Sequence, residues 1–316
     1  MERRTFLQQG TLASISALTF GAGAAAHAAA TGTNAHAAAT GTAMAKPFNM
    51  NYAPHDGMFK NSAGDNFLDQ IRFMHDQGFR GIEDNGMLKR DPAEQEKIGN
   101  LLAKLDMQMG VFVIEGGDNW KVSLATGKQE FKDTFVKVCK SAVETAKRCN
   151  AKWATVVPGF FERKLPIGIQ TANVVEALRL GAEILEPHGL IMVLEPLSDT
   201  PELFLRTADQ TYEICKAVKS PSCKILYDIY HMQRNTGHLI PMMDMCWEEI
   251  AYIQIGDNPG RKEPGTGEIN YKNIFKHLHE KGYKGILGME HGNSQSGKEG
   301  EAAVIKAYRE ADDFLG

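Results

Sequence analysis

The sequence predicts an eight-stranded (β/α)₈ barrel that follows an N-terminal leader. After residue 47, short apolar and β-branched runs alternate eight times with longer stretches of helical period. Eight such units in about 270 residues match the usual size of this barrel, about 250 residues. An open doubly wound sheet is the alternative, but the first strand is followed by Tyr52-Ala53-Pro54-His55, which is no glycine-rich phosphate loop. No interior linker indicates a second domain.

The expected elements follow one another in regular order. Strands are expected at 48–52, 81–83, 108–114, 153–157, 190–195, 224–228, 252–255 and 286–290. Helices are expected at 65–77, 92–105, 129–149, 171–187, 207–219, 242–249, 271–281 and 297–313. In the first helix Phe67, Ile71 and Met74 share one face, with Gln70 among the polar residues on the others, and Gly78 ends the helix. The last helix repeats the pattern with Ala302, Ile305 and Tyr308.

The first 46 residues lie outside the predicted barrel, which occupies 47–316. Arg3 and Arg4 precede a short apolar run at 12–18, which is typical of a secretory signal of twin-arginine type; we interpret 1–30 as this signal. A membrane anchor is the less favoured interpretation, because the apolar part is short and rich in Gly and Ala. Residues 31–46 continue a duplicated Ala/Gly/Thr tract and are expected to form a disordered spacer. The mature protein is therefore expected in the periplasm, with no membrane association after signal removal.

Composition narrows the function classes. The chain has 316 residues, with 35 Lys and Arg against 39 Asp and Glu, for a net charge of −4. A nucleic-acid partner is disfavoured, because binders of nucleic acids usually carry a basic stripe. The five cysteines are odd in number and include no CxxC pair, so buried free thiols are expected.

Polar side chains end four consecutive predicted strands. Glu195, Asp228, Gln254 and Glu290 lie at or near the carboxyl ends of strands five to eight, where barrels collect their chemistry. Such oxygen donors repel one another unless a cation neutralises them. Three carboxylates and an amide favour one divalent ion such as Mg²⁺ or Mn²⁺, and Zn²⁺ is less natural without His or Cys. The alternative is that each acid caps a helix or lies on a surface loop.

The same region resembles a known family. The residues that carry the resemblance are Val-Leu-Glu-Pro-Leu at 193–197, Leu-Tyr-Asp-Ile-Tyr-His-Met-Gln at 226–233, the stretch 252–269 and Glu-His-Gly at 290–292. The most specific stretch is 252–269, which reads Tyr-Ile-Gln-Ile-Gly-Asp-Asn-Pro-Gly-Arg-Lys-Glu-Pro-Gly-Thr-Gly-Glu-Ile. Together they resemble the hydroxypyruvate isomerase group of the xylose-isomerase-like barrel superfamily. The likeness is strong over 190–292 and continues in pattern from 47.

The resemblance implies roles for individual residues. It implies one divalent metal held by Glu195, Asp228, Gln254 and Glu290, with Glu195 and Glu290 also forming the acid–base pair. It places His231 against the substrate. Gln254 stands where the sugar epimerase branch usually has His, which favours the hydroxypyruvate isomerase branch.

Three positions keep alternatives open, and a fourth departs from the family pattern. His231 contacts the substrate, or else only hydrogen-bonds the loop after strand six. Arg261 is expected at a substrate oxygen or carboxylate, or else in a structural pair with Glu263 or Glu268. Ser198 departs from the Asn of many relatives. Trp120 either walls the pocket or packs within its loop.

The expected reaction isomerises a small hydroxy-carbonyl substrate through an enediolate, as in the conversion of hydroxypyruvate to tartronate semialdehyde, or of a related sugar or keto-sugar. Two alternatives stay open. One is an exported sugar epimerase, or a lyase or hydrolase of oxidised sugars, with the same metal site; the other is a non-catalytic periplasmic sugar-binding protein. The DNA-repair branch of the superfamily is disfavoured by the acidic charge balance. Assembly into a homo-oligomer is left open.

Overall fold

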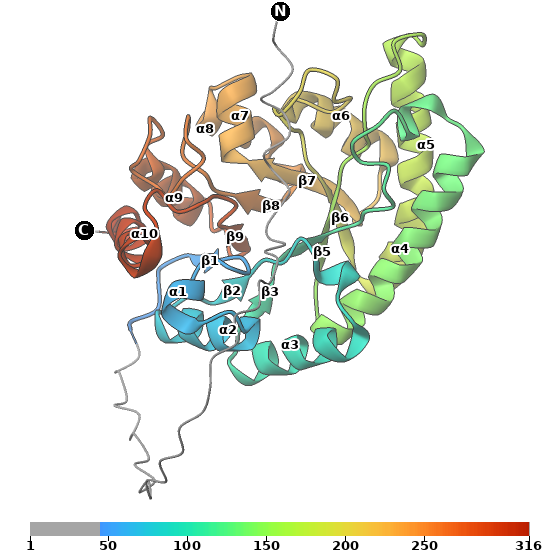
Figure 1. Ribbon diagram of the computed structural model, residues 1–316. Coiled ribbons are helices and arrows are strands. Elements are labelled where there is room, and N and C mark those ends of the chain that lie inside the picture. Colours follow the sequence, from blue (N-terminus) through green and yellow to red (C-terminus); the bar gives the residue numbers. More distant parts are fainter. Residues whose placement is uncertain (1–44, 316) are drawn as a thin grey trace, which may run out of the picture. The chain divides into compact units, whose positions relative to one another are not determined.

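Parallel strands form the centre of the protein in the computed structural model, which describes residues 45–315 (Figure 1). One sheet has the order β1-β9-β8-β7-β6-β5-β4, and β2 pairs with β3. The strands are β1 (Asn51–Ala53), β2 (Gly81–Ile82), β3 (Gln108–Met109), β4 (Val111–Val113), β5 (Trp153–Val156), β6 (Ile191–Leu194), β7 (Cys223–Asp228), β8 (Ile250–Gln254) and β9 (Ile286–Gly288). They correspond to the eight predicted strands, the third being split into β3 and β4.

Two local features close the ring. His55 and Glu83 form a parallel bridge beyond the ends of β1 and β2. Gly110 separates β3 from β4, and its N–H donates to the Ile82 carbonyl over 2.7 Å, which links this strand to β2. A Cβ at position 110 would lie 2.3 Å from the Tyr252 hydroxyl, so only glycine fits here. The closed barrel confirms the predicted fold class and excludes the open sheet.

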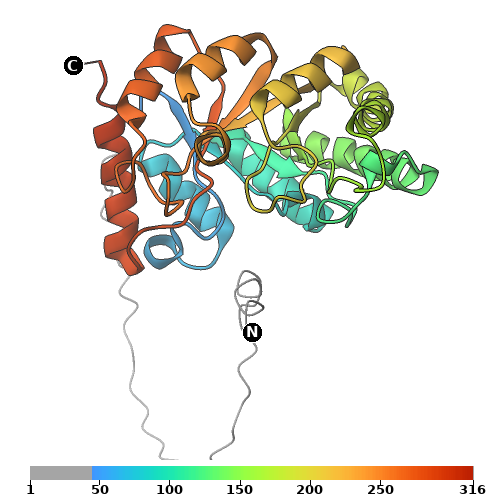
Figure 2. The same cartoon turned by 90° about the horizontal axis from the view of Figure 1, so that it is seen from above.

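Helices surround the strands on the outside (Figures 1 and 2). They are α1 (Lys60–Ala63), α2 (Phe67–Asp76), α3 (Pro92–Lys104), α4 (Gln129–Cys149), α5 (Ile167–Leu185), α6 (Ala208–Val218), α7 (Ile229–Asn235), α8 (Leu239–Cys246), α9 (Tyr271–Glu280) and α10 (Gly297–Asp312). All eight predicted helices are present. The short helices α1 and α7 were not predicted.

The buried faces of two helices differ from the prediction. Gln70 of α2 is buried, because its side chain accepts from the Gly57 N–H and donates to the Gly64 carbonyl. In α10, Ala302 is exposed and the buried face runs through Glu301, Val304 and Tyr308.

Glu301 explains this shift in α10. Its carboxylate accepts from the backbone N–H groups of Asn61 and Ser62, each over 2.8 Å. It thereby gives hydrogen-bond acceptors to backbone N–H groups at the start of α1, which have no partner within the helix and lie far away in the sequence. The last helix thus fastens the first one, and an apolar period alone could not indicate a buried acid.

The five cysteines are buried and free, as predicted. Among residues 45–315, no helix has the length and apolar character that crossing a bilayer requires. The predicted signal at 1–30 and most of the predicted spacer at 31–46 lie outside the described residues.

Candidate active site

Polar side chains line the carboxyl ends of the barrel strands. Val193, Leu226 and Tyr252 belong to a small buried cluster contributed by different strands. Glu195, Asp228 and Gln254 each follow one of these residues by two positions. Because side chains in a strand alternate with period two, each polar group shares the face of its apolar neighbour, one layer closer to the strand end.

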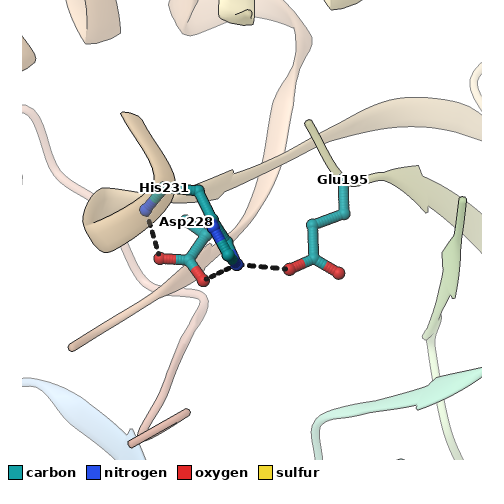
Figure 3. A group of neighbouring side chains, drawn as sticks. All are labelled: Glu195, Asp228 and His231. Atoms are coloured by element: carbon teal, nitrogen blue, oxygen red, sulfur yellow. Dashed lines mark hydrogen bonds and ion pairs between the residues drawn. The ribbon is translucent and has the colours of Figure 1, made fainter. Parts of the chain in front are cut away.

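Glu195, Asp228 and His231 meet at this end of the barrel (Figure 3). One ligand atom from each lies within 4.8 Å of the others, and all three residues are buried. The His231 Nε2 atom lies 3.5 Å from Asp228 Oδ2 and 3.8 Å from Glu195 Oε1. The three come from the end of β6, the end of β7 and the first turn of α7.

Gln254 and Glu290 border the same group. Gln254 is aligned with Asp228 in the pairing of β7 with β8. Glu290 is bound to the group through Arg261, whose Nη2 lies 3.0 Å from Asp228 Oδ2 and 2.9 Å from Glu290 Oε2. Asn85 donates to the other oxygen of Glu290 over 3.0 Å. Of the four predicted ligands, Glu195 and Asp228 therefore lie within ligand distance of each other, Glu290 is joined to Asp228 through Arg261, and Gln254 lies beside Asp228 in the sheet.

The charge state of this centre follows from its burial. Burial raises the pKa of the Glu195 carboxyl well above its ordinary value, and the charges of Glu290 and Asp228 raise it further. Burial also raises the pKa of Asp228, while the Arg261 guanidinium acts in the opposite direction. The single positive charge of Arg261 balances only part of the negative charge that Glu195, Asp228 and Glu290 carry when ionised. A second cation would therefore be electrostatically favourable at this centre.

His231 presents a proton donor to the centre. Its Nδ1 accepts from the Ser198 backbone N–H over 3.1 Å, so this nitrogen holds a lone pair. Burial, and next the charge of Arg261, lowers the pKa of His231 to about 4. A neutral ring with a lone pair on Nδ1 carries its proton on Nε2. In this tautomer His231 Nε2 faces the oxygens of Asp228 and Glu195 as a donor, and the same nitrogen belongs to the Glu195, Asp228 and His231 group whose atoms could hold a metal ion. The Ser198 N–H and hydroxyl, 3.1 and 2.7 Å from Nδ1, fix the orientation of the ring.

Two buried atoms test whether a divalent ion fits. Gln254 Oε1 and His231 Nε2 are both buried, and neither has a hydrogen-bond partner among residues 45–315. A buried carbonyl oxygen without a donor is costly unless a cation or another donor satisfies it. The atoms within ligand distance of one another come from Glu195, Asp228 and His231, a buried group that could hold a metal ion. Gln254 Oε1 and the Glu290 carboxylate would add further oxygen donors of the kind that Mg²⁺ or Mn²⁺ prefers.

The loop after β8 positions Arg261. Asp257 is fully buried, and its carboxylate accepts from the N–H groups of Gly265, Gly267 and Ile269. These glycine amides are used inside the loop, so their role there is structural. Arg261 itself adopts a left-handed conformation with φ 49°.

The alternative pairs expected for Arg261 are taken up elsewhere. Glu263 accepts from the Ser294 N–H over 2.9 Å, and Glu268 accepts from Gln233 over 3.2 Å. Arg261 turns inward instead, to Asp228 and Glu290, and its guanidinium lies over the Tyr230 ring.

A cavity of about 390 Å³ opens above the centre. Glu195, Glu290, His231 and Arg261 line it, and Trp120 forms part of its wall with 54% of its surface exposed. A second hollow of about 490 Å³ shares Arg261 and Glu290 with the first. The Glu195 and Glu290 carboxyl groups, the His231 ring and the Arg261 guanidinium thus face one space.

The sequence reasoning missed Glu83. This carboxylate is 1% exposed at the end of β2 and accepts from Gln254 Nε2 over 3.1 Å. Burial raises its pKa well above the ordinary value. The signal was present, because 81–83 was a predicted strand that ends in an acid, as strands five to eight do.

The family described as xylose isomerase-like TIM barrel matches residues 71–311. The chain belongs to this family. Its relatives include the hydroxypyruvate isomerase of Escherichia coli, 32% identical over 226 residues that cover 68% of this chain and 83% of the relative. The 2-oxo-tetronate isomerase of Cupriavidus necator is 31% identical over 139 residues, which cover 43% of this chain and 53% of that protein.

A solved structure supports the fold. The AP endonuclease, family 2, from Brucella melitensis superimposes with a TM-score of 0.70 at 24% identity, covering 81% of this chain and 98% of that one. At this identity the likeness shows the barrel alone. The curated relatives are isomerases, and this xylose isomerase-like barrel is an isomerase.

Proposed function

We propose that this protein isomerises a small α-hydroxycarbonyl acid or sugar through an enediolate, in the manner of a hydroxypyruvate isomerase that forms tartronate semialdehyde. One observation carries the proposal: Glu195 and Glu290 line the same cavity together with His231 and Arg261. The names of the relatives, hydroxypyruvate isomerase and 2-oxo-tetronate isomerase, support an acid with a hydroxyl group beside its carbonyl.

The two glutamates supply the proton path. One carboxylate removes the proton from the carbon beside the carbonyl, and the other carboxyl group returns a proton to the former carbonyl carbon, while a proton passes from the substrate hydroxyl to the former carbonyl oxygen. Burial, and next the charges of Glu290 and Asp228, raises the pKa of Glu195, which favours its protonated form relative to an ordinary glutamate, as a proton-returning group requires. Glu290 is oriented by Asn85 and Arg261, which keep its two oxygens in place.

Arg261 and His231 orient the substrate. The Arg261 guanidinium is held in place by its neighbours. Its Nε and Nη2 atoms already donate to Glu290 and Asp228, and the guanidinium lines the cavity, where its remaining N–H groups on Nη1 can donate to a substrate oxygen. The His231 Nε2–H, which makes no hydrogen bond in the described part of the chain, donates to a substrate oxygen. These contacts hold the reacting carbons beside the two glutamates.

Glu195, Asp228, Gln254 and Glu290 would hold one divalent ion, Mg²⁺ or Mn²⁺ by donor chemistry. When bound, this ion supplies Lewis-acid stabilisation of the negative charge that develops on the substrate oxygens.

The cavity also favours a second candidate. Its volume of about 390 Å³ and its Trp120 wall suit ligands longer than a three-carbon acid. An epimerase, lyase or hydrolase of oxidised sugars with the same metal site is therefore the runner-up.

Nuclear magnetic resonance in D₂O separates these functions. Hydroxypyruvate, 2-oxo-tetronate and simple ketoses are each incubated with the protein, with and without Mg²⁺ or Mn²⁺. We expect deuterium at a single carbon and a product of unchanged composition. Cleavage products would favour the lyase or hydrolase. Tight calorimetric binding without deuterium entry in any ligand would favour a binding protein and contradict the proposal.

We further propose export to the periplasm by the twin-arginine signal at 1–30. The support is the Arg3-Arg4 pair before a short apolar run. Cell fractionation tests it with an Arg3→Lys, Arg4→Lys double variant. We expect the wild-type protein in the periplasm and the variant in the cytoplasm; equal distribution of both would contradict export by this signal.

A further inference from the structure

Glu83 has a buried carboxylate that the proposed reaction does not use. It lies at the end of β2, far before the four predicted ligands in the sequence, and is 1% exposed. Gln254 Nε2 donates to Glu83 Oε1 over 3.1 Å, which joins this acid to the centre. A buried carboxylate beside a buried amide can fix the orientation of that amide.

A glutamine amide has two faces with opposite chemistry. Its oxygen can bind a cation, whereas its NH₂ group can only donate hydrogen bonds and repels a cation. A free side chain would rotate between the two orientations. An acceptor on one side fixes the NH₂ group there, and the oxygen then faces the other side. Gln254 Oε1, buried and without a donor among residues 45–315, is the oxygen so placed.

The barrel keeps a space for Glu83. A Cβ on Gly288 of β9 would lie 1.8 Å from Glu83 Oε1, and a Cβ on Gly110 would lie 3.1 Å from Glu83 Cγ. Side chains at these positions would displace the carboxylate from Gln254. Two glycines from different strands therefore leave room for this one acid.

We propose that Glu83 is a positioning residue that locks the Gln254 amide with its oxygen toward the divalent ion. This inference rests on the proposed metal site and adds a residue outside its ligand set. Partners of this kind, which orient a ligand from behind, typically change metal affinity by 10–100-fold when they are removed.

A double-mutant cycle on Mn²⁺ binding tests the inference. The variants are Glu83→Met, Gln254→Met and the double substitution, and the free Mn²⁺ signal in electron paramagnetic resonance gives each dissociation constant. We expect Glu83→Met to weaken binding by about 10–100-fold. In the Gln254→Met background, Glu83→Met should change the affinity no further, because the amide that it orients is gone.

Three further variants complete the experiment. Glu83→Gln retains an oxygen that can accept from Gln254, so we expect it to recover most of the affinity, and it keeps the test valid if Glu83→Met does not fold. Gln254→His retains one donor and one lone pair, and its Mn²⁺ affinity should still depend on Glu83. Gln170→Met, a buried glutamine of α5, is the matched control: it should lower the melting temperature without changing Mn²⁺ affinity.

The outcomes are distinguishable. Losses that multiply in the double variant would show that Glu83 acts independently of Gln254, as a ligand itself, and would overturn the inference while leaving the metal site. Unchanged Mn²⁺ affinity in folded Glu83→Met with a lower melting temperature would make Glu83 purely structural. A wild-type protein that binds no Mn²⁺ would overturn both this inference and the proposed function.

Discussion

Two buried atoms of opposite character face the same centre. Gln254 Oε1 is an acceptor and the His231 Nε2–H is a donor, and neither is satisfied within residues 45–315. Protein interiors rarely leave such groups unpaired, because each costs about 1–3 kcal/mol. A metal-assisted reaction on a hydroxycarbonyl needs an oxygen that can bind a cation and a donor that can bind a substrate oxygen. Gln254 Oε1 and His231 Nε2 have these two properties.

Replacement of Glu290 by Gln tests the acid–base pair. The variant keeps the shape of the side chain and an oxygen that can accept from Asn85, but it cannot carry the proton. We expect kcat to fall by about 10²–10⁴-fold, measured by product formation with saturating Mn²⁺. Glu115→Gln is the control, because Glu115 lines the same cavity without joining the polar centre. An equal loss in both variants would indicate a general effect of charge.

Gly288→Ala tests the packing behind the site. The new Cβ must displace Glu83 or shift β9, since it would lie 1.8 Å from Glu83 Oε1. We expect the free energy of unfolding to fall by about 1–3 kcal/mol in urea titrations. Gly168→Ala is the comparison, because no heavy atom lies within 4 Å of its Cβ. Equal stabilities of the two variants would mean that the Glu83 position tolerates movement.

At the scale of residues, sequence reasoning found the groups that follow recognisable strands. Glu195 and Asp228 end apolar runs, and the structure brings both together. Glu83 was missed although it also ends a predicted strand. The role of Ser198 could not be foreseen either, because its N–H reaches His231 only through the folded loop.

At the scale of elements, one residue serves both a helix and the site. Asp228 ends β7 and caps α7, where its Oδ1 accepts from the N–H groups of Tyr230 and His231 over 2.8 and 3.3 Å. The predicted strand at 224–228 ends where β7 ends, but the apolar residues after Asp228 gave no indication that a helix begins there, so α7 was not predicted. The predicted alternatives of metal ligand and helix cap are therefore compatible: one oxygen caps while the other faces the centre.

Asp228→Asn separates the two roles. Asparagine is as good an N-cap as aspartate, so α7 should persist, whereas the charge at the centre is lost. We expect a melting temperature of the metal-free protein closer to wild type than that of Asp228→Ala, with Mn²⁺ binding weakened in both variants. Thermal unfolding and Mn²⁺ titration provide the two readouts. Wild-type Mn²⁺ affinity in Asp228→Asn would remove Asp228 from the ligand set.

At the scale of the whole molecule, the barrel makes a site from residues that are distant in sequence. The alternation of strands and helices was sufficient to predict the closed fold, since eight units leave few other arrangements. It could not indicate the break at Gly110, which depends on the Tyr252 hydroxyl on the far side of the ring. Nor could it indicate that Glu301 of α10 fastens α1, because that contact spans the chain.

Removal of divalent ions should destabilise the whole barrel. An ion that binds the folded state alone stabilises it by about 2.7 kcal/mol at 100 times its dissociation constant. We expect a chelator to lower the melting temperature of the wild-type protein and added Mn²⁺ to restore it. Asp228→Asn, which binds the ion more weakly, should respond less than the wild type to both treatments at the same Mn²⁺ concentration. The same response in this variant as in the wild type would place the stabilising ion elsewhere.

The most direct test of the central claim is a crystal structure grown with Mn²⁺ and measured for anomalous scattering. Convergence of the four strand ends predicts one strong peak bounded by oxygens of Glu195, Asp228, Gln254 and Glu290, with the Gln254 NH₂ group still turned to Glu83. A peak elsewhere, or one that excludes two of these four side chains, would contradict it.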